Sequence, residues 1–180
     1  MLFDQAIDMP DTLVTPAVSV ALLGERGRFN LRIKPSDLAA FKKASALKLP
    51  TKINSTTITK DIMCAKLGPD EWVVICDPTS QAALTKKLVK VSQDFVCSVT
   101  EISHRNVAFE LSGSDATALL NVGCPLDLSL SSLPIGKATR TVFESVSIMV
   151  VRTGEDRFHI ECWRSFGPYL RDFFNRVLTT

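Results

Sequence analysis

The sequence of 180 residues has few of the residue types that carry catalysis. It contains two histidines, His104 and His159, and five cysteines without any Cys-x-x-Cys pair. Five widely spaced cysteines argue against a disulfide framework, and two isolated histidines cannot supply the three or four ligands of a zinc site. A Cys–His nucleophile needs surroundings that stabilise a thiolate, and no pattern marks such surroundings here. The residues alone therefore indicate no catalytic or metal centre.

Phosphate loops, membrane spans and basic runs are also missing. No Gly-x-Gly-x-x-Gly or Gly-x-x-x-x-Gly-Lys motif occurs, so the sequence predicts no nucleotide-binding loop. The longest apolar runs, such as Val18–Leu23, have the length of a strand, whereas a bilayer crossing needs about 20 apolar residues. A formal net charge of +2 is too small to predict binding to nucleic acid or to a membrane. Asp4, Asp8 and Asp11 precede any basic residue, which argues against a presequence and predicts a cytoplasmic protein.

The composition is that of a folded chain, with 46% apolar and 22% charged residues. A chain of this length is most simply one domain of ordinary size. Residues 1–16 are polar and contain Pro10 and Pro16, so we expect an N-terminal arm there. Residues 17–180 are expected to form a single α+β domain.

A pattern near residue 70 returns near residue 156. Gly68–Cys76 and Gly154–Cys162 both fit Gly-x-Asp-x-aromatic-x-aliphatic-x-Cys, and each runs into a segment with helical spacing. A strand followed by a helix is therefore used twice. We expect two pseudo-repeated βαββ-plus-helix halves, about 17–95 and 100–180, with mostly antiparallel sheets. The halves either share one core or pack as a pseudo-duplicate.

Alternation, β-branched residues and turn signals predict the other elements. Helices are expected to start at Ser36, Asp77 and Ser165, whose side chains can cap free backbone N–H groups, with Pro78 and Pro168 in the first turn. Apolar residues at helical spacing from Phe166 to Leu178 give the strongest helical signal. Residues 52–67 predict two strands or one irregular hairpin, and 18–23 a strand or the end of the arm. Further strands are expected at 29–33, 72–76, 107–111, 137–143, 146–152 and 157–162.

Side chains suited to binding gather near the predicted strand ends. Arg105, Arg140 and Arg164 stand at strand starts or at a strand–helix junction, where a guanidinium can meet carboxylates or carbonyls. Trp163 precedes Arg164, and Trp and Arg are enriched among the anchors of protein interfaces. Three interpretations stay open for these side chains: contact with a partner, internal packing or ion pairing, and ligand binding. His159 alternates with apolar neighbours, and we expect it to face solvent or a partner.

Several short motifs resemble a known family. The segments Ser103-His104-Arg105 and Leu111-Ser112-Gly113 resemble the opening of the folate-binding fold of glycine-cleavage aminomethyltransferase and its relatives. The runs Cys-Pro-Leu-Asp-Leu at 124–128 and Trp-Arg-Ser-Phe at 163–166, in this order, resemble one branch more closely. That branch is the gamma subunit of heterotetrameric sarcosine oxidase, and the resemblance covers about Val18 to Leu178.

The resemblance implies a non-catalytic subunit of an alpha-beta-gamma-delta oxidoreductase complex, which oxidatively demethylates sarcosine to glycine with oxygen. The one-carbon unit would pass to tetrahydrofolate or leave as formaldehyde. FAD, FMN, NAD, tetrahydrofolate and zinc would then belong to partner subunits, and no cofactor to this chain. Two alternatives remain: a stand-alone tetrahydrofolate-binding aminomethyltransferase-like protein, or the same subunit in a complex that oxidises another secondary or N-methyl amino acid. The subunit-interface candidates are His104, Arg105, Arg140, Trp163, Arg164 and Phe166.

Overall fold

The structure, a computed structural model, describes residues 12–179. The chain forms two compact units, each built around one sheet. One unit consists of Glu25–His104 and Gly136–Thr139, and we call it the five-stranded unit. The remaining described residues form the six-stranded unit.

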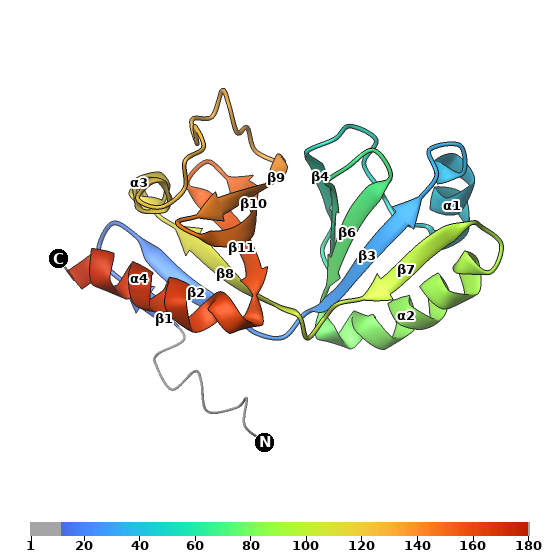
Figure 1. Cartoon of the computed structure of the whole chain (residues 1–180), viewed down its shortest axis with the longest axis horizontal. Coiled ribbons are helices and arrows are strands. Elements are labelled where there is room, and N and C mark those ends of the chain that lie inside the picture. The colour runs from blue at the N-terminus through green and yellow to red at the C-terminus, as the bar shows by residue number, and fades with distance from the viewer. Residues whose placement is uncertain (1–11, 180) are drawn as a thin grey trace, which may run out of the picture. The chain divides into compact units, whose positions relative to one another are not determined.

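The five-stranded unit is an antiparallel sheet with two helices (Figure 1). Its helices are α1 (Leu38–Ser45) and α2 (Pro78–Ser92). In spatial order, its strands are β4 (Ser55–Ile58), β5 (Ile62–Lys66), β6 (Glu71–Cys76), β3 (Gly27–Ile33) and β7 (Cys97–Glu101).

Burial explains why these segments adopt their structures. All six residues of β6 are buried, as the sequence predicts for a strand with an uninterrupted apolar run. Trp72 on β6 is fully buried, and its indole N–H donates to the carbonyl oxygen of Pro50 at 2.8 Å. Leu84, Leu88 and Val91 form the buried face of α2, in agreement with their helical spacing.

Both helices predicted in this unit are present, but only one of the two predicted side-chain caps is confirmed. Asp77 caps α2, because its carboxylate accepts the backbone N–H of Thr79 at 3.0 Å. Helix α1 instead begins after Asp37, and no side chain bonds to its free N–H groups. The hydroxyl of Ser36, the predicted cap, donates to the Asp37 carboxylate at 3.1 Å. The Ser36 hydroxyl therefore bonds to a side chain and not to a backbone N–H group of the helix.

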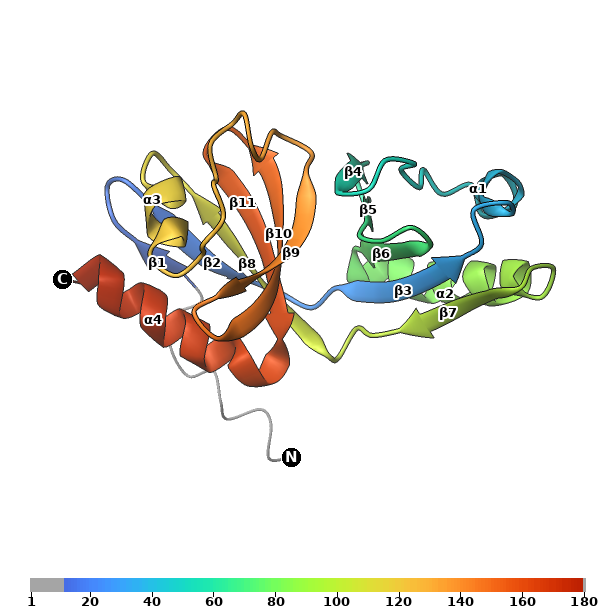
Figure 2. The same ribbon diagram turned by 45° about the horizontal axis from the view of Figure 1, so that its top comes forward.

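The six-stranded unit has the order β1-β2-β8-β11-β10-β9. Two helices and one 3₁₀ turn complete it: α3 (Ala116–Asn121), η1 (Arg164–Phe166) and α4 (Gly167–Thr179). Helices α3 and α4 lie over one face of the sheet (Figures 1 and 2). The strands are β1 (Thr12–Val14), β2 (Ser19–Leu23), β8 (Asn106–Ser112), β9 (Ala138–Phe143), β10 (Val146–Gly154) and β11 (Arg157–Trp163).

Aromatic rings join α4 to this sheet. The Phe174 ring meets Phe109 of β8 and Phe143 of β9 edge to face, with centroids 6.1 and 5.1 Å apart. The apolar stripe predicted for the last helix is therefore the packing face of α4. The predicted Ser165 cap is wrong, because Ser165 lies inside η1 and α4 begins at Gly167. Pro168 is in the first turn as predicted.

Two strands pair with partners that are distant in the sequence. Strand β2 directly precedes β3, yet it pairs with β8, where Leu22 lies opposite Phe109. Strand β7 directly precedes β8, yet it pairs with β3, where Val99 lies opposite Leu31. In the sequence, therefore, β2 of the six-stranded sheet comes just before β3 of the five-stranded sheet, and β7 of the five-stranded sheet comes just before β8 of the six-stranded sheet.

The predicted α+β class with antiparallel sheets is confirmed, and so is the hairpin within 52–67, which is β4 and β5. Strands β1 and β7 were not predicted. Strand β1 lies inside the segment expected to be an arm, and residues 1–11 of that arm lie outside the described residues.

Candidate functional site

The six-stranded unit has a shallow pocket of about 150 Å³, which we call the strand-end pocket. Residues from β8, β11, β10 and β9, which are neighbours in the sheet, line it together with one residue that precedes β8. The lining residues are Arg105, Asn106, Arg140, Thr141, Ser147, Ile148, Met149, Glu161, Cys162 and Trp163.

Strand alternation places polar groups in this pocket. Ile160 on β11 points into the apolar core, so Glu161 and Trp163 emerge on the opposite face. Cross-strand register then sets Asn106 of β8 beside Trp163, and Met149 of β10 beside Glu161. Four of the lining side chains therefore share the sheet face that is opposite to α3 and α4.

Glu161 is a buried carboxylate, with 2% of its surface exposed. One of its oxygens lies 2.9 Å from Nε2 of His159, and the other accepts the Asn106 amide at 3.3 Å. The prediction that His159 faces solvent or a partner is wrong, because its side chain is buried beside Glu161. These bonds compensate for taking polar groups out of water and fix the carboxylate in the pocket lining.

Arginine and tryptophan form the exposed part of the same pocket. Arg105 is exposed, and its Nε donates to the Asn106 side chain at 3.2 Å. Trp163 is 52% exposed, and its ring stacks on that of Phe166, with centroids 6.2 Å apart. The backbone N–H of Arg164 donates to the carbonyl of Arg105 at 2.8 Å, which ties η1 to the start of β8.

The structure gathers five of the six predicted interface residues. Arg105, Arg140 and Trp163 line the pocket, while Arg164 and Phe166 follow directly in η1. His104 is exposed and belongs to the five-stranded unit. Sequence reasoning missed Asn106, Ser147, Met149 and Glu161. For Glu161 a signal was available, because it stands two residues before Trp163 and so shares its strand face.

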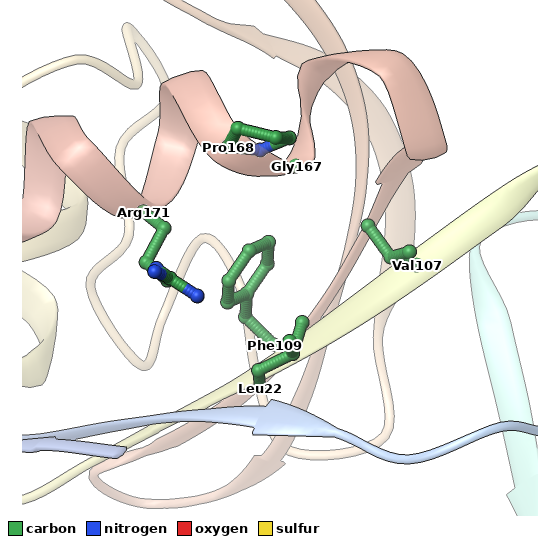
Figure 3. A pocket seen from close by; sticks show the side chains of 6 residues that line it. All are labelled: Leu22, Val107, Phe109, Gly167, Pro168 and Arg171. Carbon is green, nitrogen blue, oxygen red and sulfur yellow. The ribbon is translucent and has the colours of Figure 1, made fainter. Parts of the chain in front are cut away.

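A second, much smaller cavity lies under the first turn of α4 (Figure 3). Its volume is about 10 Å³, which is the space of a single water molecule. A Cβ on Gly167 would lie 2.9 Å from the Val107 side chain, so the helix backbone packs closely on β8 here. The space is too small for an organic ligand. It is lined by Leu22, Val107, Phe109, Gly167, Pro168 and Arg171.

Other chemistry is sparse in the part of the chain that the structure describes. Across residues 12–179, no three His, Cys, Asp or Glu side chains come together as a metal site would require. Among the same residues, no helix combines the length and apolarity needed to cross a bilayer. Burial raises the pKa of the Cys64 thiol to about 12, which disfavours its reactive thiolate form.

Comparison with known proteins identifies the family. A profile of the sarcosine oxidase, gamma subunit family matches residues 32–177, which is most of the chain. The chain belongs to this family. A sarcosine oxidase subunit gamma of Corynebacterium sp. (strain P-1) is 32% identical over 103 residues, covering 57% of this chain and 50% of that protein. Its counterpart from Arthrobacter sp. is 30% identical over 94 residues, covering 52% and 45%. The matched region thus spans about half the length of these members of the family.

Solved structures share the fold. Heterotetrameric sarcosine oxidase from Corynebacterium sp. U-96, in complex with pyrrole 2-carboxylate, contains a chain that matches with a TM-score of 0.81 at 22% identity. That match covers 96% of this chain and 87% of the other. Glycine cleavage system aminomethyltransferase T from Bartonella henselae matches with a TM-score of 0.69 at 17% identity, covering 88% and 45%. At these identities the likeness concerns the fold alone.

Proposed function

We propose that this chain is a non-catalytic gamma subunit of a heterotetrameric oxidase that demethylates sarcosine to glycine. The match of residues 32–177 to the gamma subunit family carries this proposal. In the proposed reaction, the one-carbon unit passes to tetrahydrofolate or leaves as formaldehyde. The alternative within this proposal is the same subunit in a complex that oxidises another secondary or N-methyl amino acid.

The partners in this proposal are the alpha, beta and delta subunits. FAD, FMN, NAD, tetrahydrofolate and zinc would be held by those subunits and not by this chain. The name of the solved complex, a heterotetrameric sarcosine oxidase, supports an assembly of several chains. This chain would act in that assembly through its surfaces.

The strand-end pocket and the neighbouring η1 are the proposed contact with a partner subunit. Trp163 and Phe166 keep 52% and 37% of their surfaces exposed, although both rings are large and apolar. The buried Glu161 carboxylate and the exposed Arg105 guanidinium give the same surface fixed polar groups. An aromatic anchor beside arginine is the composition typical of residues that dominate binding energy at interfaces.

The two units are further proposed to be pseudo-repeats that together form one domain over residues 17–180. The strand order β4-β5-β6-β3 in one sheet corresponds to β9-β10-β11-β8 in the other. Along the chain, one set runs β3-α1-β4-β5-β6-α2 and the other runs β8-α3-β9-β10-β11-α4. This correspondence supports duplication of one unit within the chain.

Co-expression with candidate partner subunits tests the function. We expect the full chain to co-purify with them in equal amounts, together with sarcosine-dependent oxygen consumption by the complex. Trp163→Ala should remove about 2 kcal/mol or more of binding energy, and so lower the amount of complex recovered. Val89→Ala, at a residue that is 53% exposed on α2, is the control and should leave recovery unchanged.

Arg140→Ala should likewise weaken assembly more than folding. The melting temperature of each isolated variant separates the two effects, because an interface residue contributes little to the free chain. A large fall in that temperature would show that Trp163 or Arg140 serves folding instead. Failure of the wild-type chain to join any partner would refute the proposed function itself.

A stand-alone tetrahydrofolate-binding protein is the second candidate. The fold shared with aminomethyltransferase T, at a TM-score of 0.69, is the observation that favours it. Titration calorimetry of the isolated full chain with tetrahydrofolate distinguishes the two. Saturable binding at micromolar concentration would support the second candidate, whereas the gamma subunit proposal expects none.

A further inference from the structure

The two units differ strongly in charge. The five-stranded unit contains all eleven lysines of the chain, and in total fourteen Lys and Arg against eight Asp and Glu. The rest of the chain contains seven Arg against eleven Asp and Glu. Three of those eleven acidic residues, Asp4, Asp8 and Asp11, lie outside the described residues, so the six-stranded unit as described has seven Arg against eight Asp and Glu. The small net charge of +2 therefore conceals one strongly basic unit and one that is nearly balanced.

The positive charge is most concentrated between Asp37 and Asp61. This stretch has five lysines and no acidic residue, and it covers α1, the connection to β4, and β4 itself. Without intervening carboxylates, the lysines repel one another and create a positive potential over this surface. They are Lys42, Lys43, Lys48, Lys52 and Lys60.

Three of these lysines line a groove of about 450 Å³, which we call the lysine groove. Lys42 and Lys43 come from the last turn of α1, and Lys48 from the connection that follows. The other lining residues are largely apolar: Ala46, Leu47, Leu49, Pro50, Thr51 and Thr57. The groove thus combines cationic groups with an apolar floor.

The connection that builds the groove is fixed by hydrogen bonds to its backbone carbonyls. Trp72, buried in the sheet, donates to Pro50 at 2.8 Å, and Lys66 donates to Thr51 at 3.0 Å. The Thr57 hydroxyl donates to the carbonyl of Lys48. An irregular segment held at these points needs little further ordering to bind a partner.

We propose that the lysine groove docks an acidic segment of a partner chain, with carboxylates against the lysines and an apolar side chain on the floor. The inference rests on the proposed function in one respect, that this chain works bound to other subunits. A second copy of the chain docked groove to groove is a poor occupant, because it would bring lysines against lysines. Nucleic acid fits less well for two reasons. No arginine lines the groove to bind a phosphate with two hydrogen bonds, and no aromatic side chain lines it to stack on a base.

Charge reversal tests the proposal in the co-expressed complex. The triple variant K42E/K43E/K48E should reduce the amount of chain recovered with its partners at least tenfold at physiological salt. The control K86E/K87E/K90E makes the same charge change on α2, where all three lysines are exposed, and should leave recovery within twofold of wild type. Equal losses in the two variants would show that the change in net charge alone causes the effect, and would overturn the proposal.

Carbodiimide coupling of the wild-type complex gives an independent measurement, because this reagent joins a lysine only to a carboxylate in direct contact. We expect cross-links from Lys42, Lys43 or Lys48 to Asp or Glu of a partner, and their absence would overturn the proposal. Binding of a double-stranded oligonucleotide by the isolated chain that is lost only in K42E/K43E/K48E would assign the groove to nucleic acid instead. If the wild-type chain joins no partner at all, the proposed function fails, whereas normal assembly of the groove variant refutes the docking site alone.

Discussion

Replacing Gly113 by alanine should destabilise the six-stranded unit for two separable reasons. The backbone of Gly113 has φ = +122°, a conformation that residues with a side chain rarely adopt. A Cβ at this position would lie 2.3 Å from the carbonyl oxygen of Ala17. Strain of this kind costs about 1–3 kcal/mol. Moving the Ala17 carbonyl away would also break its 3.2 Å bond from the Asp115 N–H, a loss of about 1 kcal/mol.

The total penalty is therefore about 2–4 kcal/mol, which lowers the melting temperature of a chain of this size by about 10 °C. Differential scanning calorimetry of the full chain measures it. Two other glycines serve as controls. Gly24→Ala should change nothing, because no atom lies within 4 Å of the new Cβ. Gly136→Ala isolates the conformational cost, since its φ is +82° but the nearest atom is 3.7 Å away.

The expected order of destabilisation is Gly113→Ala, then Gly136→Ala, then Gly24→Ala. A melting temperature for Gly113→Ala within 2 °C of wild type would refute the reasoning, because neither strain nor close approach would then matter at this position. An equal loss in Gly24→Ala would contradict both causes, because neither a positive φ nor a close contact exists there and the effect of alanine on the unfolded chain is stabilising.

Two further predictions concern titrating side chains. Hydrogen bonds from the side chain and the backbone of Thr79 lower the pKa of Asp77 below 3.8, so its capping stabilises the fold above that pH and is lost as the pH falls. Asp77→Ala should lower the melting temperature at pH 7, and this loss should shrink progressively as the pH falls below 3.8. Asp37→Ala, at a helix start without a side-chain cap bond, should change the melting temperature little at pH 7, and losses equal to those of Asp77→Ala would contradict the assignment. Because the pKa of Cys64 is raised to about 12, an aromatic disulfide reagent at pH 8 should modify the partly exposed Cys97 at least tenfold faster, and equal rates would contradict the burial of Cys64.

Patterns that depend on one strand or helix were predictable from the sequence. The apolar run of β6, the helical face of α2 and the capping of α2 by Asp77 all follow from residues within a few positions of one another. Strand β7 escaped prediction because Cys97–Glu101 is short and mostly polar, and its partner β3 is distant in sequence. Pairing with β3 supplies the stabilisation that the local sequence lacks.

The sequence allowed several residues of the site to be predicted, but not how these residues are arranged in space. Placing Arg105, Arg140 and Trp163 at strand ends required only local patterns. Their meeting in one pocket depends on the neighbouring positions of β8, β11, β10 and β9, which follow from pairing across the sheet. His159 was misjudged because alternation shows which face a side chain occupies but not whether that face is buried.

The pairing of β2 with β8 has a consequence for synthesis on the ribosome. Every strand of the five-stranded sheet has been made once Glu101 is translated. Strand β2 is made before that sheet, but its partner β8 is made after it. Until β8 is available, the apolar edge Ser19–Leu23 can pair only with the three-residue β1. Slow translation between these points would prolong the exposure of that edge, and the nascent chain would then depend on chaperones to avoid aggregation.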